Sequence, residues 1–267
     1  MDNARVVAAQ VDRVFAIDNT EEPDPALVEA LCTIPGLTYT ALGDNLGIAA
    51  ALNRGIEQIR TAGYTWALTM DQDSTPDPGM VSTLATCAGA CDTTLPMGIV
   101  APVHVRVGGP AAKHRVGCFS TLTAMTSGNL LSTAAWEAVG RFDEGLFIDG
   151  VDHELCLRMH RSGFAVMRCR EARLLHRLGD MQRHAFPVTV YVSNHSALRR
   201  YYITRNIFEV TRRYRDDFPQ FRHREMKRLR REIGKLALYE DHKIEKLLMS
   251  WRGYLDYRRG VTGRYTR

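Results

Sequence analysis

Short hydrophobic runs alternate with stretches of helical periodicity along the first half of the chain. The runs with the length of buried β-strands are RVFAID (13–18), GLTYTAL (36–42), YTWALTM (64–70) and GIVAPVHV (98–105). Nonpolar residues recur at helical spacing in the segments 25–32, 45–60 and 78–91. Strands that alternate with helices of this length indicate βαβ units, and hence an α/β fold with a mixed, mostly parallel sheet flanked by helices.

Helical patterns prevail in the second half. We expect a short helix at 132–140, a longer helix at 151–161 and a strand at 164–169, and the segment ARLLHRLGD (172–180) completes this mixed half. From Ser196 onward the chain is basic and amphipathic with helical spacing. The pattern predicts an α/β domain over residues 1–195, followed by a basic, mainly helical C-terminal extension over residues 196–267.

The composition is that of a soluble globular protein, with 45% hydrophobic and 24% charged residues. The longest nonpolar runs fall far short of the roughly 20 residues that a membrane-spanning helix needs. The polar N-terminus MDNARVV is no signal peptide. We therefore expect a cytoplasmic protein.

Cysteine spacing adds to this expectation. The chain contains six cysteines and no CxxC pair. The pattern predicts mostly buried free thiols in a reducing compartment, with neither a zinc site nor a disulfide framework. The six are Cys32, Cys87, Cys91, Cys118, Cys156 and Cys169.

The formal net charge of +5 is unevenly distributed. Lys and Arg strongly outnumber Asp and Glu between Arg199 and Arg231. Such a helical segment is either a solvated face or an attachment to anionic lipid, and the sequence leaves both open. Nucleic acid is not an expected partner, because the basic residues lie outside any recognised nucleic-acid fold.

Polar residues follow the third predicted strand in the stretch DQDS, which begins at Asp71. Residues i and i+2 of an extended segment point to the same side, so Asp71 and Asp73 can converge on one cation. Mg²⁺ prefers carboxylate oxygens together with substrate phosphates. Alternatively, the same residues only close a turn before the next helix.

Two further residues can carry chemistry. Asp152 begins the helix at 151–161, where it can accept a proton from a sugar hydroxyl or simply favour the helix dipole. His176 follows a nonpolar run and either completes a metal site or has a structural role.

A second polar group follows the first predicted strand. This strand ends at Asp18 and Asn19, and Asn45 is expected to cap the helix at 45–60. Gly47 near that helix start lets a ligand approach the backbone, although packing alone explains most of the pattern.

Taken in order, several segments resemble one family. These are IDNT, NLGIAAALNRGI, WALTMDQDS, SGNLLS, GRFDEGLFIDGVDHELCLR, LLHRLGD and RRYYITRN. They resemble the family 2 glycosyltransferases of GT-A fold, in their rhamnosyltransferase-like branch. The similarity covers about residues 10 to 210, and it implies that residues 1–195 form the catalytic domain.

The resemblance implies a donor site. Asp18 matches the residue that contacts the nucleobase, with Asn19 beside it, and the helix from Asn45 past Gly47 lines the same nucleotide pocket. The segment Asp71, Gln72 and Asp73 matches the motif that binds ribose and a metal-bridged diphosphate. His176 matches a further ligand of the metal, which is Mg²⁺ or Mn²⁺.

The resemblance also implies roles for residues of the second half. Asp152 matches the catalytic base, and Arg205 with Asn206 matches a pair near the diphosphate of the donor. Ser127, Gly128 and Asn129 match a loop on the acceptor side.

The implied reaction is inverting glycosyl transfer in cell-surface polysaccharide and cell-wall synthesis. The expected donor is dTDP-L-rhamnose, and the expected acceptor is a glycan or a lipid-linked glycan. The protein is then expected in the cytoplasm, or bound peripherally to the inner membrane face through its basic C-terminal helices.

Two departures from the family pattern leave alternatives open. Relatives usually begin with a strand that reads like VxVTYNP, whereas only MDNARVVAAQVD precedes this region, so the first strand is expected to be missing or truncated. Val151 stands where many members of the wider family have an acidic residue. The alternatives are a haloacid dehalogenase-like phosphatase that uses Asp71 and Asp73, or a non-catalytic nucleotide-binding relative.

Overall fold

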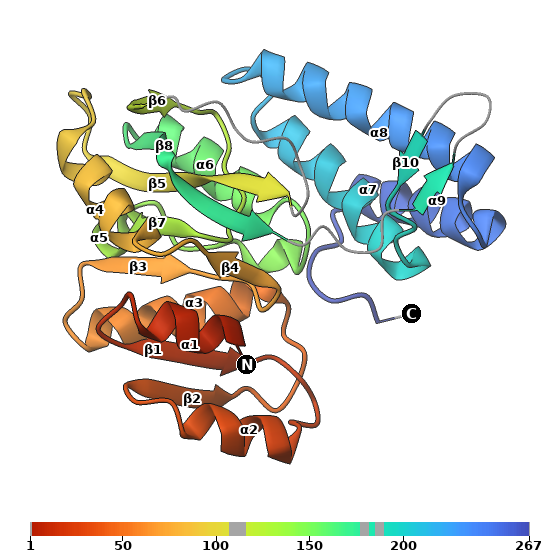
Figure 1. The fold of residues 1–267 in the computed structure, drawn as a ribbon. Helices are drawn as coiled ribbons and strands as arrows, with labels where there is room; N and C mark the ends of the chain where they lie inside the picture. Colours follow the sequence, from red (N-terminus) through yellow and green to blue (C-terminus); the bar gives the residue numbers. More distant parts are fainter. Residues whose placement is uncertain (1, 107–115, 177–181, 185–189, 267) are drawn as a thin grey trace. The chain divides into compact units, whose positions relative to one another are not determined.

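The structure of the protein is a computed structural model. It describes residues 2–106, 116–176, 182–184 and 190–266 (Figure 1). The chain divides into two compact units. Unit 1 comprises Met1–Asp143 and Leu155–Arg177, and unit 2 comprises Glu144–Glu154 and Leu178–Arg267.

Unit 1 contains two β-sheets. Strands β1 (Val14–Asp18) and β2 (Leu37–Ala41) pair in parallel. The second sheet is mixed and has six strands in the order β3-β7-β5-β8-β4, with β6 paired to β8. Its strands are β3 (Trp66–Thr69), β4 (Ser74–Pro76), β5 (Met97–Arg106), β6 (Cys118–Ser120), β7 (Asn129–Ser132) and β8 (Ala165–His176). Strands β3, β5 and β8 share one direction, because β5 and β8 are parallel and β3 and β5 are both antiparallel to β7.

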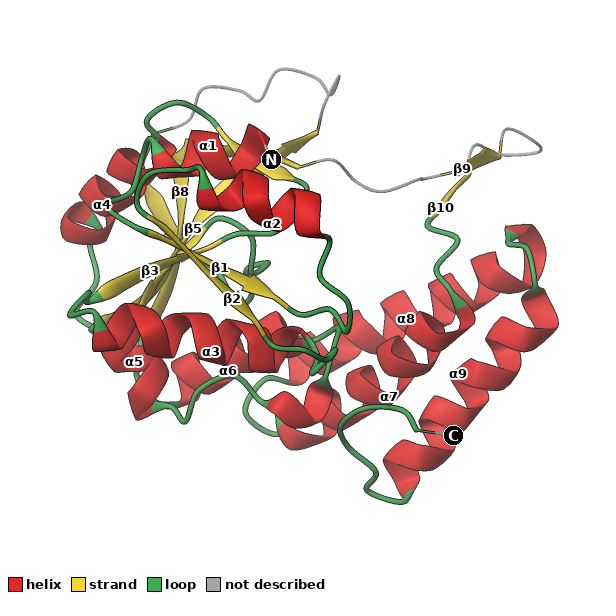
Figure 2. Ribbon diagram, turned by 90° about the horizontal axis from the view of Figure 1, so that it is seen from below, coloured by secondary structure: helices red, strands yellow, loops and turns green. Residues whose placement is uncertain are grey.

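Helices cover both faces of these strands (Figure 2). One face carries α1 and α4, and the other carries α3, α5 and α6. The helices of unit 1 are α1 (Asp2–Ala8), α2 (Pro25–Cys32), α3 (Ile48–Thr61), α4 (Met80–Ala90), α5 (Thr133–Ala138) and the larger part of α6 (Val151–Arg161). This arrangement confirms the predicted α/β fold with a mixed sheet between helices.

Local chemistry explains where two of these helices begin. Helix α2 has the predicted bounds, because Asp24 accepts hydrogen bonds from the N–H groups of Ala26 and Leu27 and because proline suits the first helical position. Helix α3 begins later than predicted, and its N-cap is Gly47. The prediction that Asn45 caps this helix is wrong.

One hydrophobic core of unit 1 lies between α4 and the large sheet. Met80 and Leu84 of α4 pack on Val100 of β5, Leu130 of β7 and Leu174 of β8. Burying a side chain of this size contributes about 1.5–3 kcal/mol. The strand predicted at 164–169 continues to His176 as one strand, β8, and its pairing with β5 shifts register along its length.

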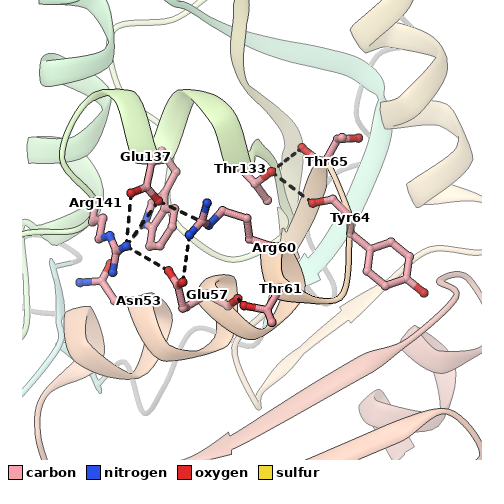
Figure 3. Close-up of polar contacts among 10 residues, drawn as sticks. Asn53, Glu57, Arg60, Thr61, Tyr64, Thr65, Thr133, Glu137 and Arg141 are labelled. Atoms are coloured by element: carbon pink, nitrogen blue, oxygen red, sulfur yellow. Dashed lines mark hydrogen bonds and ion pairs between the residues drawn. The ribbon is translucent and has the colours of Figure 1, made fainter.

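A polar network joins α3 to α5 on the other face (Figure 3). The buried Asn53 amide donates to the carbonyl of Phe142 over 3.0 Å and accepts from the Trp136 indole over 3.2 Å and from the Phe142 N–H over 2.9 Å. At the surface, Arg60 and Arg141 both pair with Glu57 and Glu137. Exposed pairs of this kind contribute little, so Asn53 is the stronger link between the two helices.

The cysteines contradict the expectation of free thiols. Cys87 is paired with Cys169, and Cys91 with Cys118, as disulfides. Cys32 and Cys156 take part in no disulfide in the described part of the chain. The prediction failed because the cysteines of each pair are 82 and 27 residues apart, and only the packing of α4 on β6 and β8 brings them together.

Unit 2 is mainly helical. It contains the 3₁₀ helix η1 (Glu144–Leu146), the first turn of α6, the hairpin of β9 (Gln182–His184) and β10 (Val190–Val192), and the helices α7 (Ala197–Arg213), α8 (Pro219–Tyr239) and α9 (Lys243–Arg258). Ser196 caps α7 by accepting from the N–H of Arg199. Among the described residues, no helix is long and nonpolar enough to cross a membrane.

A buried ionic group connects these three helices. Glu240, which caps the end of α8, pairs with Arg200 of α7 and with Lys246 of α9. All three side chains are buried. Removing one partner of such a group leaves an uncompensated buried charge and costs about 3–5 kcal/mol.

We predict that Asn53→Ala lowers the free energy of unfolding by roughly 3 kcal/mol. The substitution leaves the buried N–H groups of Trp136 and Phe142 without their acceptor, and each such group costs about 1–3 kcal/mol. Denaturation in urea measures the change. The control Arg60→Gln removes only exposed ion pairs and should cost less than about 1 kcal/mol. Equal losses in the two variants would contradict this view of the α3–α5 contact.

Candidate active site

Asp18 ends β1 and lies in a network of short hydrogen bonds. Its Oδ1 accepts from the N–H and the hydroxyl of Thr20 over 3.1 and 2.6 Å, and its Oδ2 accepts from the hydroxyl of Tyr39 over 2.6 Å. Tyr39 belongs to β2, in which it pairs with Ala16 of β1. The parallel pairing of the two strands therefore fixes the orientation of this carboxylate.

These bonds control the ionisation of both groups. Partial burial by itself raises the pKa of Asp18, but the hydrogen bonds from Thr20 and Tyr39 outweigh it and hold the pKa below its usual value of 3.8. The bond to Asp18 raises the pKa of Tyr39 to about 12. At neutral pH the carboxylate is charged and the phenol remains a donor.

The next predicted residues lie in two loops that meet, one after β1 and one before α3. Asn19 donates to the side-chain oxygen of Asn45 over 3.2 Å and accepts from the N–H of Leu46 over 2.8 Å. The same Asn45 oxygen accepts from the N–H of Gly47 over 3.1 Å. Gly47 is buried, has a φ of 88° and begins α3 without a side-chain cap. The structure thus brings Asn19, Asn45 and Gly47 together at the start of α3.

The DQD segment lies between β3 and β4. Asp71 is half-buried, Gln72 and Asp73 are exposed, and Ser74 is buried as the first residue of β4. The N–H of Asp71 donates to Ser127 Oγ over 3.1 Å, and Asn3 of α1 donates to the carbonyls of Asp71 and Gln72. The backbone is therefore held from two sides, while Asp73 faces solvent.

Ser127, Gly128 and Asn129, at the start of β7, support this segment. Gly128 donates to the carbonyl of Thr69 over 2.6 Å, and Asn129 pairs with Thr69 in the sheet. A Cβ on Gly128 would lie 2.7 Å from Pro102 Cγ, and its φ of 83° also favours glycine. All three residues are buried, so their observed contacts are structural.

His176 ends β8 next to the same segment. In the antiparallel pairing of β4 with β8, His176 lies opposite Ser74, which follows Asp73 directly. The structure describes its backbone only. The register therefore brings this position and the DQD segment to one edge of the sheet.

Asp152 belongs to unit 2 and follows a strained loop. Phe147, Asp149 and Gly150 have φ values of 65°, 63° and 84°. Left-handed backbone at non-glycine residues costs about 1–3 kcal/mol each and persists only where the surroundings hold it. Asp152 itself is half-buried in the first turn of α6, where its Oδ1 accepts from the N–H of His153 over 2.8 Å.

Asn206 and Arg205 of α7 hold this loop. The Asn206 amide donates to the carbonyls of Leu146, Ile148 and Asp149 over 2.7–2.8 Å. Arg205 is 2% exposed, and its guanidinium donates to the carbonyls of Gly145, Leu146 and Gly263. Arg205 also donates to Asn206 Oδ1 over 2.9 Å and lies over the Tyr202 ring. Its observed contacts are thus with other groups of the protein, and its role near a diphosphate stays a prediction.

The residue types at this edge of unit 1 include ones that could hold a hard divalent cation. Asp71 and Asp73 supply carboxylate oxygens, which Mg²⁺ and Mn²⁺ prefer, and the imidazole of His176 is also acceptable to Mn²⁺. Asp18 and the start of α3 offer hydrogen-bonding groups for a polar ligand. Unit 1 therefore contains the predicted donor residues, and unit 2 contains Asp152 and Arg205.

Sequence reasoning missed four contributors, Tyr39, Thr20, Asn3 and Asp149. Tyr39 of β2 bonds to Asp18 of β1, and Asn3 of α1 bonds to the DQD segment. These contacts join segments that are separate in the sequence, so the hydrophobic pattern does not reveal them. Thr20 had a local signal, because a threonine two residues after an aspartate commonly closes a turn. Asp149 pairs with Arg199 over 3.1 Å and so joins the strained loop to α7.

We predict that Tyr39→Phe raises the pKa of Asp18, because it removes one donor to the carboxylate. A carboxyl whose pKa is lowered on folding stabilises the fold above its unfolded pKa, and this contribution is lost as pH falls through the folded pKa. The variant should therefore lose part of its stability at neutral pH but little at acid pH. NMR titration of the carboxyl carbon measures the shift, with Tyr64→Phe as control. An unchanged Asp18 pKa in Tyr39→Phe would contradict the assignment.

Comparison with known sequences gives two matches. Residues 5–101 match the profile described as Glycosyl transferase family 2. The dTDP-rhamnosyl transferase RfbF of Shigella flexneri is 28% identical over 224 residues, which cover 79% of this chain and 75% of the relative.

Solved structures agree in fold. GalNAc-T7 with UDP, GalNAc and Mn²⁺ matches 94% of this chain with a TM-score of 0.59 and 12% identity, although the match spans only 50% of that longer chain. TarS 1–349 of S. aureus matches 92% of this chain and 71% of its own, with a TM-score of 0.57 and 11% identity. The mannosyltransferase PcManGT of Pyrobaculum calidifontis, in complex with GDP-Man and Mn²⁺, matches 93% of this chain and 73% of its own, with a TM-score of 0.54 and 13% identity.

At such identities the solved structures establish the fold alone, and the sequence matches show similarity to family 2 glycosyltransferases. Together they favour glycosyl transfer over the phosphatase alternative for Asp71 and Asp73. The profile match over residues 5–101, the curated relative and the shared fold support a glycosyltransferase of GT-A fold that is similar to family 2 enzymes and to rhamnosyltransferases.

Proposed function

We propose that this protein transfers L-rhamnose from dTDP-L-rhamnose to a hydroxyl of a glycan or lipid-linked glycan, with inversion at the anomeric carbon. The observation that carries the proposal is the DQD segment, in which Asp73 is exposed while hydrogen bonds hold the backbone at the end of β3. The choice of donor is supported by the similarity to a protein named as a dTDP-rhamnosyl transferase.

In this proposal the nucleotide lies along the end of β1 and the start of α3. Asp18 stays ionised at neutral pH and accepts a hydrogen bond from the nucleobase N–H. Asn19, Asn45 and Gly47 form the neighbouring wall. The N-terminus of α3 carries the positive end of the helix dipole, which favours the polar and anionic parts of a nucleotide.

The diphosphate binds at the DQD segment. Asp71, Gln72 and Asp73 contact ribose and diphosphate, and Asp71, Asp73 and His176 hold a divalent cation. When bound, Mg²⁺ or Mn²⁺ neutralises the negative charge that develops on the departing nucleoside diphosphate. The residues of the chain orient the donor so that its anomeric carbon faces the acceptor.

Asp152 is the proposed base. It accepts the proton of the acceptor hydroxyl as that oxygen bonds to the anomeric carbon and the bond from this carbon to the diphosphate breaks. Asn206 and Arg205 act as positioning residues, because they fix the loop that precedes Asp152. The proposal also includes Arg205 as a residue near the diphosphate. It includes Ser127, Gly128 and Asn129 as residues on the acceptor side.

We further propose a cytoplasmic protein with a catalytic domain over residues 1–195 and an extension over 196–267 that contacts the membrane. Three side chains spaced along one stripe of α9 are largely exposed, namely Ile244 (77%), Leu248 (62%) and Trp251 (59%). Leu238, near the end of α8, is 68% exposed. Nonpolar residues with a tryptophan and nearby cations are typical of helices that lie on anionic membranes.

Exposed cations lie on the preceding helix. The exposed basic residues of α8 are Arg222, Arg224, Lys227, Arg228, Arg230 and Arg231. Glu225 of the same helix is buried and pairs with Arg224 and Arg228. The solvent-facing part of α8 is therefore strongly positive, which supports an anionic surface as its partner.

We predict that dTDP with Mn²⁺ raises the melting temperature of the protein by roughly 5–10 °C at 100 times Kd, since ligand binding at that ratio contributes about 2.7 kcal/mol. Asp73→Ala should abolish the rise. Asp92→Ala, which changes an exposed aspartate outside the segment, should retain it. The donor assignment fails if no nucleoside diphosphate shifts the melting curve in the presence of metal.

We predict that Asp152→Asn retains donor binding but lowers the rate of transfer about 10²–10⁴-fold, the usual contribution of a general base. Isothermal titration with dTDP measures the binding, and release of dTDP from dTDP-L-rhamnose in the presence of acceptor measures turnover. Turnover at the wild-type rate would remove Asp152 from this role and leave the donor site standing.

We predict that wild-type protein sediments with vesicles of phosphatidylglycerol but not with vesicles of phosphatidylcholine. The double variant Leu248→Ser and Trp251→Ser should lose this binding. Leu198→Ser, which changes another exposed leucine of unit 2, should retain it. Equal sedimentation of both variants would show that the α9 stripe is not the contact surface.

A further inference from the structure

His104 lies near the end of β5 and contacts the loop that supports the DQD segment. Its Nε2 is 3.0 Å from the carbonyl oxygen of Ser127. A carbonyl oxygen only accepts hydrogen bonds, so Nε2 carries a proton and is the donor. The side chain is half-buried, and the reaction proposed above does not use it.

The same loop is also bound to the end of β3. Ser127 Oγ accepts from the N–H of Asp71 over 3.1 Å. Gly128 donates to the carbonyl of Thr69 over 2.6 Å, and the Thr69 hydroxyl donates to the carbonyl of Thr126 over 2.5 Å. The loop therefore connects β5 to the first residue of the DQD segment.

Close packing leaves this loop little freedom to move. Gly128 has a φ of 83°, and a Cβ at this position would lie 2.7 Å from Pro102 Cγ and 2.9 Å from Leu174 Cδ2. Ser127 is only 1% exposed. Because tightly packed interiors transmit displacements, a shift of the Ser127 carbonyl also moves its hydroxyl and the N–H of Asp71.

We propose that His104 is a positioning residue for the metal and diphosphate site. Its bond to the Ser127 carbonyl holds the Ser127 hydroxyl against the N–H of Asp71, and so determines where the carboxylates of the DQD segment lie. Replacing a residue that orients metal ligands commonly weakens metal binding about 10–100-fold. This inference rests on the proposed donor site and adds a residue to it.

The alternative is that the bond of His104 only stabilises the fold. A second histidine of unit 1 provides the comparison, because His160 Nε2 lies 3.0 Å from the carbonyl oxygen of Thr121 and its side chain is also half-buried. That bond joins α6 to Thr121, outside the loop at 126–128. The two histidines therefore make the same kind of bond to different segments.

The test measures the affinity for dTDP by isothermal titration, once with Mn²⁺ and once with a chelator. In His104→Leu, the gain in affinity that Mn²⁺ provides should fall about 10-fold, while the affinity without metal stays unchanged. His160→Leu should keep the full gain. His104→Gln should recover most of it, because the glutamine amide can donate the same bond.

An unchanged gain in His104→Leu, an equal loss in His160→Leu or no recovery in His104→Gln would each overturn the role of His104. No gain from Mn²⁺ in the wild-type protein would overturn the proposed donor site and this inference with it. If His104→Leu does not fold, wild-type protein supplies the readout. Adding dTDP with Mg²⁺ should then shift the NMR signals of the His104 ring more than those of the His160 ring, and equal shifts would contradict the proposal.

Discussion

The hydrogen bonds that hold the backbone after β3 are the constraint on which the candidate site depends. Ser127 and Asn3 fix the peptide groups of Asp71 and Gln72, and Gly128 binds the last residue of β3. Because backbone groups supply these bonds, Asp73 is exposed at the edge of the sheet. The buried loop at 127–129 thus serves the site by shaping this segment, since only glycine fits beside Pro102 at its centre.

In unit 2, buried side chains likewise hold the backbone next to the candidate base, Asp152. Asp152 follows a loop with two left-handed non-glycine residues, and Asn206 satisfies three of the carbonyls that this loop exposes. Arg205 adds bonds from a fully buried guanidinium. Burying Asn206 and Arg205 costs desolvation free energy, but the two side chains hold the loop in one conformation. A base that accepts a proton from one particular oxygen requires such a fixed position.

The sequence predicted what local chemistry determines. Helix α2 was predicted to the residue because Asp24 and Pro25 mark its start, and α6 because its nonpolar stripe and Gly163 mark its length. The prediction that Asn45 caps α3 was wrong because its side chain bonds to Asn19, in the loop after β1, and to the N–H of Gly47. The cysteine pairs and the partners of Asp18 depend on contacts between distant segments, which spacing alone does not encode. The resemblance supplied the roles of the site residues, and packing showed how they are held.

The central claim is that the DQD segment holds the metal and the diphosphate of a nucleotide donor. Paramagnetic broadening of backbone amide signals by Mn²⁺, in the presence of dTDP, tests it most directly, because the effect falls off steeply with distance from the ion. The account predicts that the signals of Asp71 to Ser74 and of His176 broaden first. Broadening centred elsewhere in the chain, or none with nucleotide bound, would contradict it.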